Sequence, residues 1–169
     1  MSRNVAPLIV VMGVSGSGKT TVGHKVAQRL GLPYAEADDF HPPQNVAKMR
    51  AGIPLDDEDR RPWLEMIATW LAEHAGRGGV VTCSALKRRY RDRLTAVAPD
   101  VFFLHLDGSA ELIASRLAAR QGHFMPLHLL QSQIDALEPL AADESGAVVP
   151  IEGTPEQTTA LALNAVKDR

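Results

Sequence analysis

Gly13-Val-Ser-Gly-Ser-Gly-Lys19-Thr20 is the stretch of sequence that decides the fold of this chain. It fits the pattern G-x-x-x-x-G-K-[ST], which is the P-loop that cradles phosphate groups. The apolar run Leu8–Met12 before it is typical of a buried parallel strand. Residues 21–30 after it carry apolar side chains at helical spacing. Strand, glycine loop and helix therefore follow in the order that a phosphate-binding loop requires.

The residue types of this loop suit the phosphates of ATP. Glycines let the backbone turn tightly so that its N–H groups point into one concavity, and the start of the next helix adds partial positive charge. Lys19 is predicted to reach the β- and γ-phosphates, and the Thr20 hydroxyl is predicted to bind Mg²⁺. The residues expected to contact the nucleotide here are Gly13, Val14, Ser15, Gly16, Ser17, Gly18, Lys19, Thr20 and Thr21. A glycine-rich turn without a ligand is the alternative interpretation.

The composition indicates one globular domain over residues 1–169, with 45% apolar and 22% charged residues. A net charge of −2 gives no basic footprint for nucleic acid. No apolar run is long enough to cross a membrane, and the polar P-loop interrupts any signal-peptide core, so the expected location is the cytoplasm. The one cysteine, Cys83, excludes an internal disulfide and fits a reducing compartment.

Alternating strand and helix patterns predict an α/β fold with a parallel sheet. Strands are expected at residues 8–12, 32–37, 80–83, 101–106 and 147–151. Helices are expected at residues 21–30, 45–50, 62–74, 87–97, about 109–120, after 126 to about 137, and from 155 onward. Pro62 and Pro155 are expected to open their helices, and Ser109 or Asp107 to cap another. Five parallel strands with a P-loop after the first predict a three-layer architecture of the nucleoside-monophosphate-kinase type, which by itself does not name the acceptor.

Polar residues follow the second predicted strand, in an irregular segment of about residues 38–62. Asp38 should lie at the carboxyl edge of the sheet, facing the phosphates. There it can accept a hydroxyl proton or hold Mg²⁺ through water, although a loop-capping role is also open. His41 offers hydrogen bonds to hydroxyl groups. Lys48 and Arg60 add positive charge, although each taken singly also fits solvated surface charge.

Two pairs of cations are spaced four residues apart, so each pair shares a helix face. Lys87 and Arg91 follow the third strand and are predicted to grip a carboxylate, with a plain basic helix exterior as the alternative. Arg116 and Arg120 precede the break at residues 121–126 and look like part of a lid over about residues 116–130. Such a lid would bring positive charge to a phosphoryl-transfer transition state. Surface pairing of these arginines with Glu111 or Asp107 is the alternative.

A series of motifs, taken in order, resembles the gluconokinase family, whose members use ATP to convert D-gluconate to 6-phosphogluconate. The motifs are Asp38-Asp-Phe-His-Pro42, Asn45-Val-Ala-Lys-Met49, Gly52-Ile-Pro-Leu55, Asp59-Arg60, Pro62-Trp-Leu64, Cys83-Ser-Ala-Leu-Lys87, Tyr90-Arg-Asp92, His123-Phe-Met125 and Leu130 to Gln133. The family more often has Gly where this chain has Ala37. The resemblance runs over most of the chain and is weak only in its last thirty or so residues.

The resemblance implies that ATP and Mg²⁺ are used, that the 6-hydroxyl of gluconate is the acceptor, and that the protein is a homodimer. It supports catalytic roles for Lys19, Asp38 and Arg120, with Asp38 favoured over Asp39 as the acid/base. The implied substrate-binding residues are Asp38, His41, Lys48, Arg60, Lys87 and Arg91, and Arg116 and Arg120 are added to the nucleotide site.

Two other functions stay open. One is a P-loop kinase for another small acceptor, such as shikimate or a nucleotide, against which the acidic–histidine motif and the Ser-Ala-Leu-Lys series both count. The other is a nucleotide switch, which the lack of an N-K-x-D signature makes a poor match.

Overall fold

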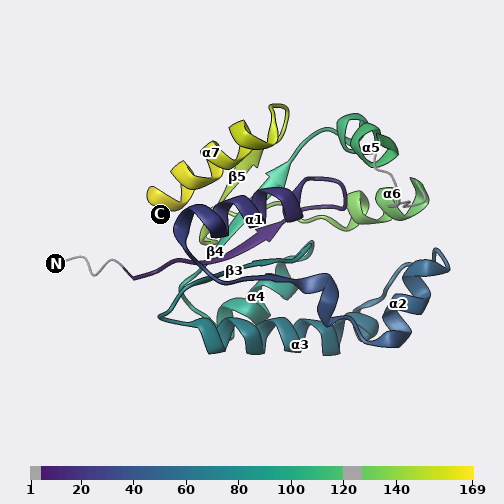
Figure 1. Ribbon diagram of the computed structural model, residues 1–169. Coiled ribbons are helices and arrows are strands. Elements are labelled where there is room, and N and C mark those ends of the chain that lie inside the picture. Colours follow the sequence, from purple (N-terminus) through teal and green to yellow (C-terminus); the bar gives the residue numbers. More distant parts are fainter. Residues whose placement is uncertain (1–4, 120–126) are drawn as a thin grey trace.

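The central sheet has five parallel strands in the order β2-β3-β1-β4-β5, shown in a computed structural model in Figure 1. The structure describes residues 5–119 and 127–169. The strands are β1 (Leu8–Met12), β2 (Tyr34–Glu36), β3 (Gly79–Thr82), β4 (Val101–Asp107) and β5 (Gly146–Pro150). The first strand is central, with Leu8 opposite Gly79 of β3 on one side and Val101 of β4 on the other. The predicted α/β class and parallel five-stranded sheet are confirmed.

Helices cover both faces of this sheet, which makes three layers (Figure 1). The helices are α1 (Lys19–Leu30), α2 (Pro43–Arg50), α3 (Asp57–His74), α4 (Arg88–Val97), α5 (Ala110–Ala119), α6 (Leu127–Ala136) and α7 (Pro155–Lys167), with a short 3₁₀ turn, η1 (Ala37–Phe40), after β2. The α1 and α7 helices lie on one face, and α3 and α4 lie on the other. The α2 and α6 helices lie beyond the carboxyl ends of the strands.

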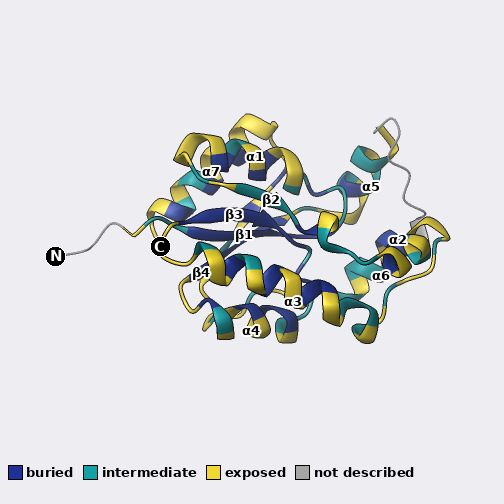
Figure 2. Cartoon of the chain, turned by 60° about the horizontal axis from the view of Figure 1, so that its bottom comes forward, coloured by how far each residue is buried: buried dark blue, intermediate teal, exposed yellow. Residues whose placement is uncertain are grey.

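Two hydrophobic cores meet at β1, because alternate side chains of a strand point to opposite faces. Val10 and Met12 pack with Ile67 of α3, whereas Ile9 and Val11 pack with Val26 of α1. All five residues of β1 are buried, which explains the unbroken apolar run in the sequence. In Figure 2 the central strands appear as a buried layer between helices whose outer faces are exposed.

The α3 helix begins earlier than predicted, so the expectation that Pro62 opens it is wrong. It starts after Asp56, whose carboxylate accepts a hydrogen bond from the Asp59 amide at 2.8 Å. In return the Asp59 carboxylate accepts from the Asp56 amide at 3.1 Å, which completes a capping box. Pro62 lies inside the helix and removes the amide that would bond Glu58. Both residues are exposed, so water can satisfy the freed carbonyl.

Two other helix starts agree with the sequence. The Ser109 hydroxyl accepts a hydrogen bond from the Leu112 amide at 3.1 Å, so Ser109 rather than Asp107 caps α5. Pro155 opens α7 after Thr154, as predicted. None of the helices among the described residues combines the length and apolar character needed to cross a membrane.

Candidate active site

The P-loop connects β1 to α1 and is folded by glycines in the left-handed region. Gly13, Gly16 and Gly18 have φ values of 147°, 84° and 95°. A Cβ atom at Gly13 would lie 2.7 Å from the Ser17 hydroxyl and 2.8 Å from the Leu106 carbonyl, so only glycine fits there. Gly18 stands at the N-terminus of α1, so the helix points its free N–H groups at the loop.

Lys19 lies across the loop that precedes it. Its Nζ donates hydrogen bonds to the carbonyls of Gly13 at 2.9 Å and Val14 at 3.0 Å. The ammonium is therefore held beside the backbone of the phosphate-binding loop. Two residues of the loop itself, Val14 and Ser17, are buried. The Ser17 hydroxyl has no hydrogen-bond partner within residues 5–119 and 127–169.

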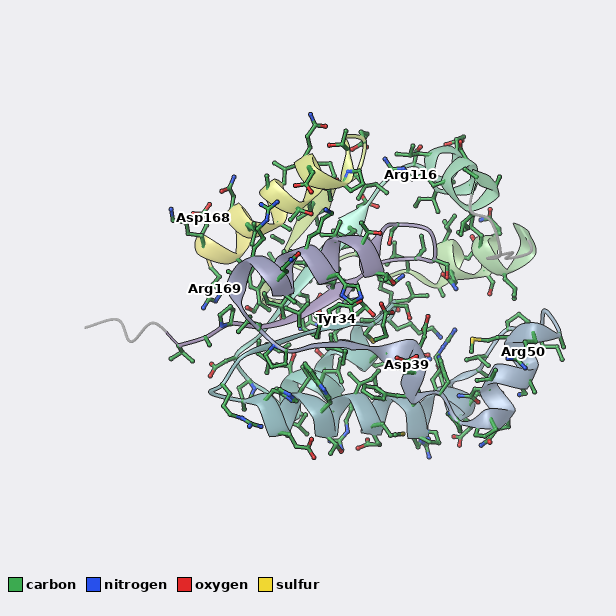
Figure 3. The ribbon with its side chains drawn as sticks, viewed as in Figure 1. Tyr34, Asp39, Arg50, Arg116, Asp168 and Arg169 are labelled. Carbon is green, nitrogen blue, oxygen red and sulfur yellow. The ribbon has the colours of Figure 1, made fainter. Side chains whose placement is uncertain are left out.

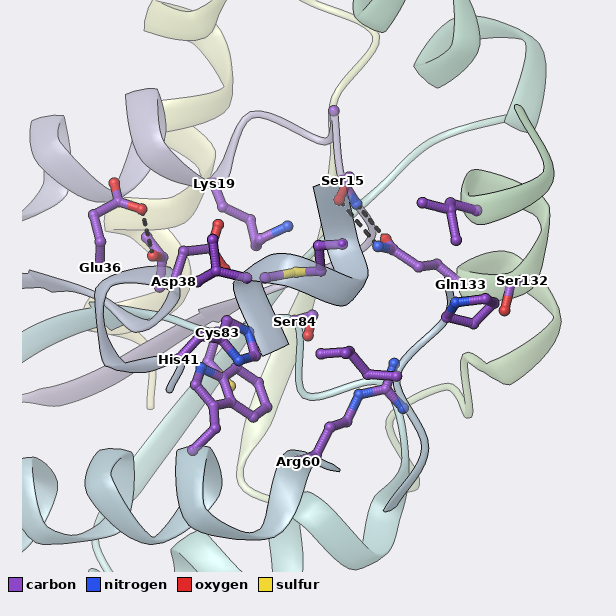
Figure 4. Close-up of a pocket in the computed structure, with 18 of the residues that line it drawn as sticks. Ser15, Lys19, Glu36, Asp38, His41, Arg60, Cys83, Ser84, Ser132 and Gln133 are labelled. Carbon is purple, nitrogen blue, oxygen red and sulfur yellow. Dashed lines mark hydrogen bonds between the residues drawn. The ribbon is translucent and has the colours of Figure 1, made fainter. Parts of the chain in front are cut away.

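A cavity of about 450 Å³ joins this loop to the irregular segment after β2 (Figure 4). The P-loop side is lined by Ser15, Gly16, Gly18, Lys19 and Thr20. The chain from the end of β2 to the first turns of α3 contributes Glu36, Asp38, His41, Val46, Met49, Arg50, Ile53, Pro54, Leu55, Arg60 and Trp63. The end of β3 contributes Thr82, Cys83 and Ser84, and α6 contributes Leu129, Ser132 and Gln133. Of the predicted nucleotide residues, Gly13, Val14, Ser17 and Thr21 do not line it.

Asp38 is in η1, directly after β2, and its neighbour Asp39 does not line the cavity. The structure thus brings Asp38 into one space with Lys19 and Thr20, as expected for the carboxyl edge of a parallel sheet. Cys83 lines the same space, but burial is the main cause that raises the pKa of its thiol to about 12. The sulfur is therefore protonated and weakly nucleophilic at neutral pH.

Glu36 also lines the cavity, although sequence reasoning assigned it no role. The Tyr34 hydroxyl donates to one oxygen of its carboxylate, and the Thr82 hydroxyl donates to the other at 3.1 Å. Burial and the nearby carboxylate raise the pKa of Tyr34, so the phenol keeps its proton and stays a donor. The signal available in the sequence was an acidic residue at the end of a strand, two positions before Asp38.

The oxygen groups in this part of the cavity are compatible with a magnesium ion. Thr20 supplies a hydroxyl, and Glu36 and Asp38 supply carboxylates. Mg²⁺ prefers oxygen ligands and is bound through one or two carboxylates plus substrate phosphates. These three side chains are therefore the ones that would hold it.

His41 and Arg60 line the acceptor side of the cavity, as the sequence predicts. The His41 ring stacks on Trp63, with centroids 4.7 Å apart and planes within 3°. Burial is the main cause that lowers the pKa of His41. Arg60 donates from its guanidinium to the Tyr90 hydroxyl at 3.2 Å. Lys48 does not line the cavity, because its ammonium pairs with the Asp59 carboxylate at 2.8 Å.

The prediction that Arg91 binds substrate together with Lys87 is wrong. Arg91 is only 1% exposed and pairs with the buried Glu144 through bonds of 2.6 Å and 3.1 Å. It also donates to the Ala85 carbonyl at 2.8 Å. The face of α4 that carries Arg91 packs inward, so four-residue spacing does not bring it to the cavity. Lys87 lies before α4, 3.4 Å from Asp57, and does not line the cavity either.

Arg91 instead supports the loop that follows β3. Ala85 in this loop has a φ of 46°, which is strained for a residue with a Cβ atom. The Leu86 carbonyl accepts from the Glu138 amide at 2.7 Å, and Arg91 holds the neighbouring carbonyl. These bonds fix the loop that presents Ser84 to the cavity, and the Ser84 carbonyl in turn accepts from the Gly13 amide at 3.3 Å.

The predicted lid is described only in part, because Arg120 and residues 121–126 lie outside the described residues. Arg116 on α5 donates to the carbonyls of Ile151 and Gly153 and does not line the cavity (Figure 3). In the described part of the chain no ion pair joins Arg116 to Glu111 or Asp107. The lid roles of Arg116 and Arg120 stay predictions.

Gln133 connects α6 to the P-loop. Its side-chain oxygen accepts from the Ser15 amide at 2.7 Å, and its nitrogen donates to the Ser15 hydroxyl at 3.1 Å (Figure 4). The sequence offered Gln133 only as part of a family motif, without a role. Its contact places α6, whose first residues fall within the predicted lid, against the phosphate-binding loop.

Comparison with known proteins identifies the family of this fold and cavity. A family model described as an AAA domain matches residues 8–140. The thermosensitive gluconokinase of Escherichia coli (strain K12) is 50% identical over 141 residues, which are 82% of this chain and 75% of that protein. The gluconokinase of Gluconobacter oxydans (strain 621H) is 52% identical over 138 residues, which are 80% and 78%. The chain belongs to the gluconokinase family, within the AAA-domain family.

A solved structure supports the same assignment. The crystal structure of a gluconokinase from Sinorhizobium meliloti 1021 is 44% identical to this chain, with a TM-score of 0.91 over 98% of this chain and 94% of that one. This gluconokinase-family chain therefore shares its whole architecture with that enzyme. The resemblance predicted from the motifs is confirmed.

Proposed function

We propose that the protein transfers the γ-phosphoryl group of ATP to the 6-hydroxyl of D-gluconate and releases 6-phospho-D-gluconate. One observation carries this proposal: a single cavity is lined by the P-loop at one side and by Asp38, His41 and Arg60 at the other. A phosphoryl donor and a hydroxyl acceptor can thus meet in one place. The relatives named gluconokinase support gluconate as the acceptor.

On the donor side, the backbone N–H groups of the P-loop and the start of α1 would hold the phosphates of ATP. Lys19 would add a positive charge at the transferred group. Thr20, with Glu36 and Asp38 nearby, would hold Mg²⁺, which neutralises phosphate charge during transfer. The Gly13 and Val14 carbonyls hold the Lys19 ammonium beside this loop.

On the acceptor side, Asp38 would orient the 6-hydroxyl and accept its proton. Arg60 takes over the role that the sequence gave to Arg91, because its guanidinium lines the cavity and can bind the gluconate carboxylate. His41 would bind a substrate oxygen. Lys48 and Lys87 are proposed as secondary cations only, since each already pairs with an aspartate.

The family resemblance also supports three further proposals, which concern the lid, the cellular location and the assembly of the protein. Arg120, with Arg116, would supply lid charge over the phosphates on closure. The protein would act in the cytoplasm as a homodimer. Light scattering on the purified protein measures the assembly directly.

Arg60→Ala should raise the KM for gluconate by about ten- to a hundredfold and change the KM for ATP by less than about threefold. A hydrogen bond to a charged group contributes about 1.5–3 kcal/mol, which corresponds to that loss of affinity. Arg61→Ala is the matched control, because Arg61 is exposed and pairs only with Glu58 among the described residues. Steady-state kinetics, with the concentration of each substrate varied in turn, measures both KM values in the two variants. Equal losses in both variants would remove Arg60 from the substrate site.

An acceptor panel tests the proposed function. ADP release is measured with gluconate, other aldonates, shikimate and nucleoside monophosphates, each at several concentrations. We expect gluconate to stimulate ADP release most strongly. Slow hydrolysis that no acceptor stimulates would point to a nucleotide switch, and stimulation by shikimate or a nucleotide would replace gluconate as the substrate.

A further inference from the structure

Asn45 is a fully buried residue in the first turn of α2. It does not line the cavity itself, but its side chain contacts His41, which does. Its Nδ2 lies 2.7 Å from the Asp59 carbonyl and 3.2 Å from the His41 Nδ1. A carbonyl oxygen only accepts hydrogen bonds, so the amide must present its nitrogen to Asp59. The second hydrogen on Nδ2 is then directed at His41.

This contact determines where the His41 proton sits. Because Asn45 donates to Nδ1, Nδ1 must carry a lone pair, and the ring hydrogen must be on Nε2. A doubly protonated ring would set an N–H group against the N–H group of Asn45, so the contact also opposes the imidazolium form. Within the described ranges, the hydrogen bonds of the His41 ring involve Nδ1 alone.

The ring is fixed in orientation as well as in protonation. His41 stacks in parallel on Trp63, which is itself held by a hydrogen bond from its indole nitrogen to the Ala37 carbonyl at 2.7 Å. Both His41 and Trp63 line the cavity, whereas Asn45 does not. Asn45 therefore acts on the cavity only through the histidine.

We propose that Asn45 is a positioning residue that holds His41 as the neutral Nε2–H tautomer, so that His41 is a fixed hydrogen-bond donor to an oxygen of the acceptor. The identity of that acceptor as a sugar acid rests on the proposed function. A free neutral imidazole can donate or accept with either nitrogen. An N–H group fixed at Nε2 binds a ligand oxygen that accepts a hydrogen bond, and it repels a ligand ammonium group in the same position. His41 therefore contributes to the choice of acceptor.

The charges around His41 agree with a neutral ring. Burial is the largest cause and lowers the pKa of His41. Asp38 from η1 raises it, and Arg60 from α3 lowers it further, with a net lowering. The neighbour from α2 is the uncharged Asn45. The lowered pKa thus favours the neutral ring that the Asn45 contact requires.

The direct test is ¹⁵N NMR of the histidine rings in the unmodified full-length protein without substrate, with His41 assigned by the signal lost in His41→Gln. We expect Nε2 in the protonated range and Nδ1 in the unprotonated range at neutral pH and above. A protonated Nδ1 would overturn the proposal. This measurement needs no acceptor, so a protein with the expected tautomer but no gluconate kinase activity would refute the proposed function and leave the tautomer standing.

Asn45→Asp keeps the shape of the side chain but replaces the donor with an acceptor. We expect a proton on Nδ1 and a KM for gluconate raised about three- to tenfold, with the KM for ATP unchanged. The rise should depend on pH, because the new carboxylate favours the charged ring. Gln44→Glu is the matched control, since it makes the same chemical change at an exposed neighbour on the same helix.

Asn45→Ala covers the case in which the aspartate variant does not fold. It removes the donor without adding charge, and we expect His41 to show a mixture of both tautomers. An unchanged Nε2–H tautomer in either folded variant, or equal KM changes in Gln44→Glu, would contradict the proposal. If neither variant folds, the spectrum of the unmodified protein still decides.

Discussion

Asp38→Asn is expected to lower kcat for gluconate phosphorylation by about 10²–10⁴, which is the usual contribution of a positioned acid or base. Asp38 is the second residue after β2 and lines the same cavity as Lys19 and Thr20. Asparagine keeps the size of the side chain but cannot take the proton of the hydroxyl. The KM for gluconate should change less, because the proposed carboxylate contact is made by Arg60 and not by Asp38. Steady-state kinetics at saturating ATP measures both constants.

Asp39→Asn is the matched control for this experiment, since Asp39 is adjacent in sequence but does not line the cavity. We expect less than about a tenfold loss of kcat there, far below the loss at Asp38. A larger loss at Asp39 would mean that the wrong carboxylate has been chosen. If high Mg²⁺ restores the Asp38 variant, the loss comes from weakened metal binding, and Asp38 is not the group that takes the proton.

Glu144→Gln is expected to lower the free energy of unfolding by about 3–5 kcal/mol, because it leaves the buried Arg91 charge without its partner. The two side chains are 1% and 5% exposed. Glu65→Gln is the matched control: Glu65 pairs with Arg93, two residues after Arg91 on the same helix, but this pair is about half exposed. Exposed pairs contribute about 0–1 kcal/mol. Urea unfolding of both variants measures the difference, and equal losses would contradict the assignment of a buried pair.

The same pair predicts a dependence on pH. Burial raises the pKa of Glu144, but hydrogen bonds from Arg91 and the Ala141 amide outweigh burial, and the net pKa lies below the usual 4.5. A lowered pKa in the folded state stabilises the protein above about pH 4.5, and this stabilisation is lost as the pH falls through the folded value. The free energy of unfolding should therefore decline more steeply below pH 4.5 in the unmodified protein than in Glu144→Gln.

Local sequence patterns were enough to predict most of the fold. The P-loop, the buried first strand and the helix after it are each encoded in a short window, where glycine spacing and apolar periodicity act directly. The parallel sheet followed from the alternation of strands and helices. Asp38 could be placed because a residue that follows a parallel strand must lie at the carboxyl edge of the sheet.

Residue spacing alone could not predict whether the helix face that carries Arg91 points toward the cavity or toward the interior. Lys87 and Arg91 share a face by periodicity, but periodicity does not say whether that face meets the cavity or the interior. The partner of Arg91 is Glu144, 53 residues later in the chain, and no local pattern connects them. Pro62 was misplaced because the capping box of Asp56 and Asp59 starts the helix earlier in the chain.

The residues that sequence reasoning missed are defined by contacts between segments that lie far apart in the chain. Asn45 contacts His41 and not the cavity, and Gln133 contacts the Ser15 amide from a helix far along the chain. Glu36 is the last residue of β2, and its carboxylate accepts a hydrogen bond from the Thr82 hydroxyl of β3, 46 residues later in the chain. Each becomes visible only when segments distant in sequence are brought together by the fold.

The position of the transferred phosphate tests the central claim most directly. The purified protein is incubated with ATP, Mg²⁺ and uniformly ¹³C-labelled gluconate, and the product is examined by ¹³C and ³¹P NMR. The account predicts one product, in which phosphorus couples to C6 of the sugar acid. Phosphate on another carbon, or ATP consumption without any phosphorylated gluconate, would contradict it.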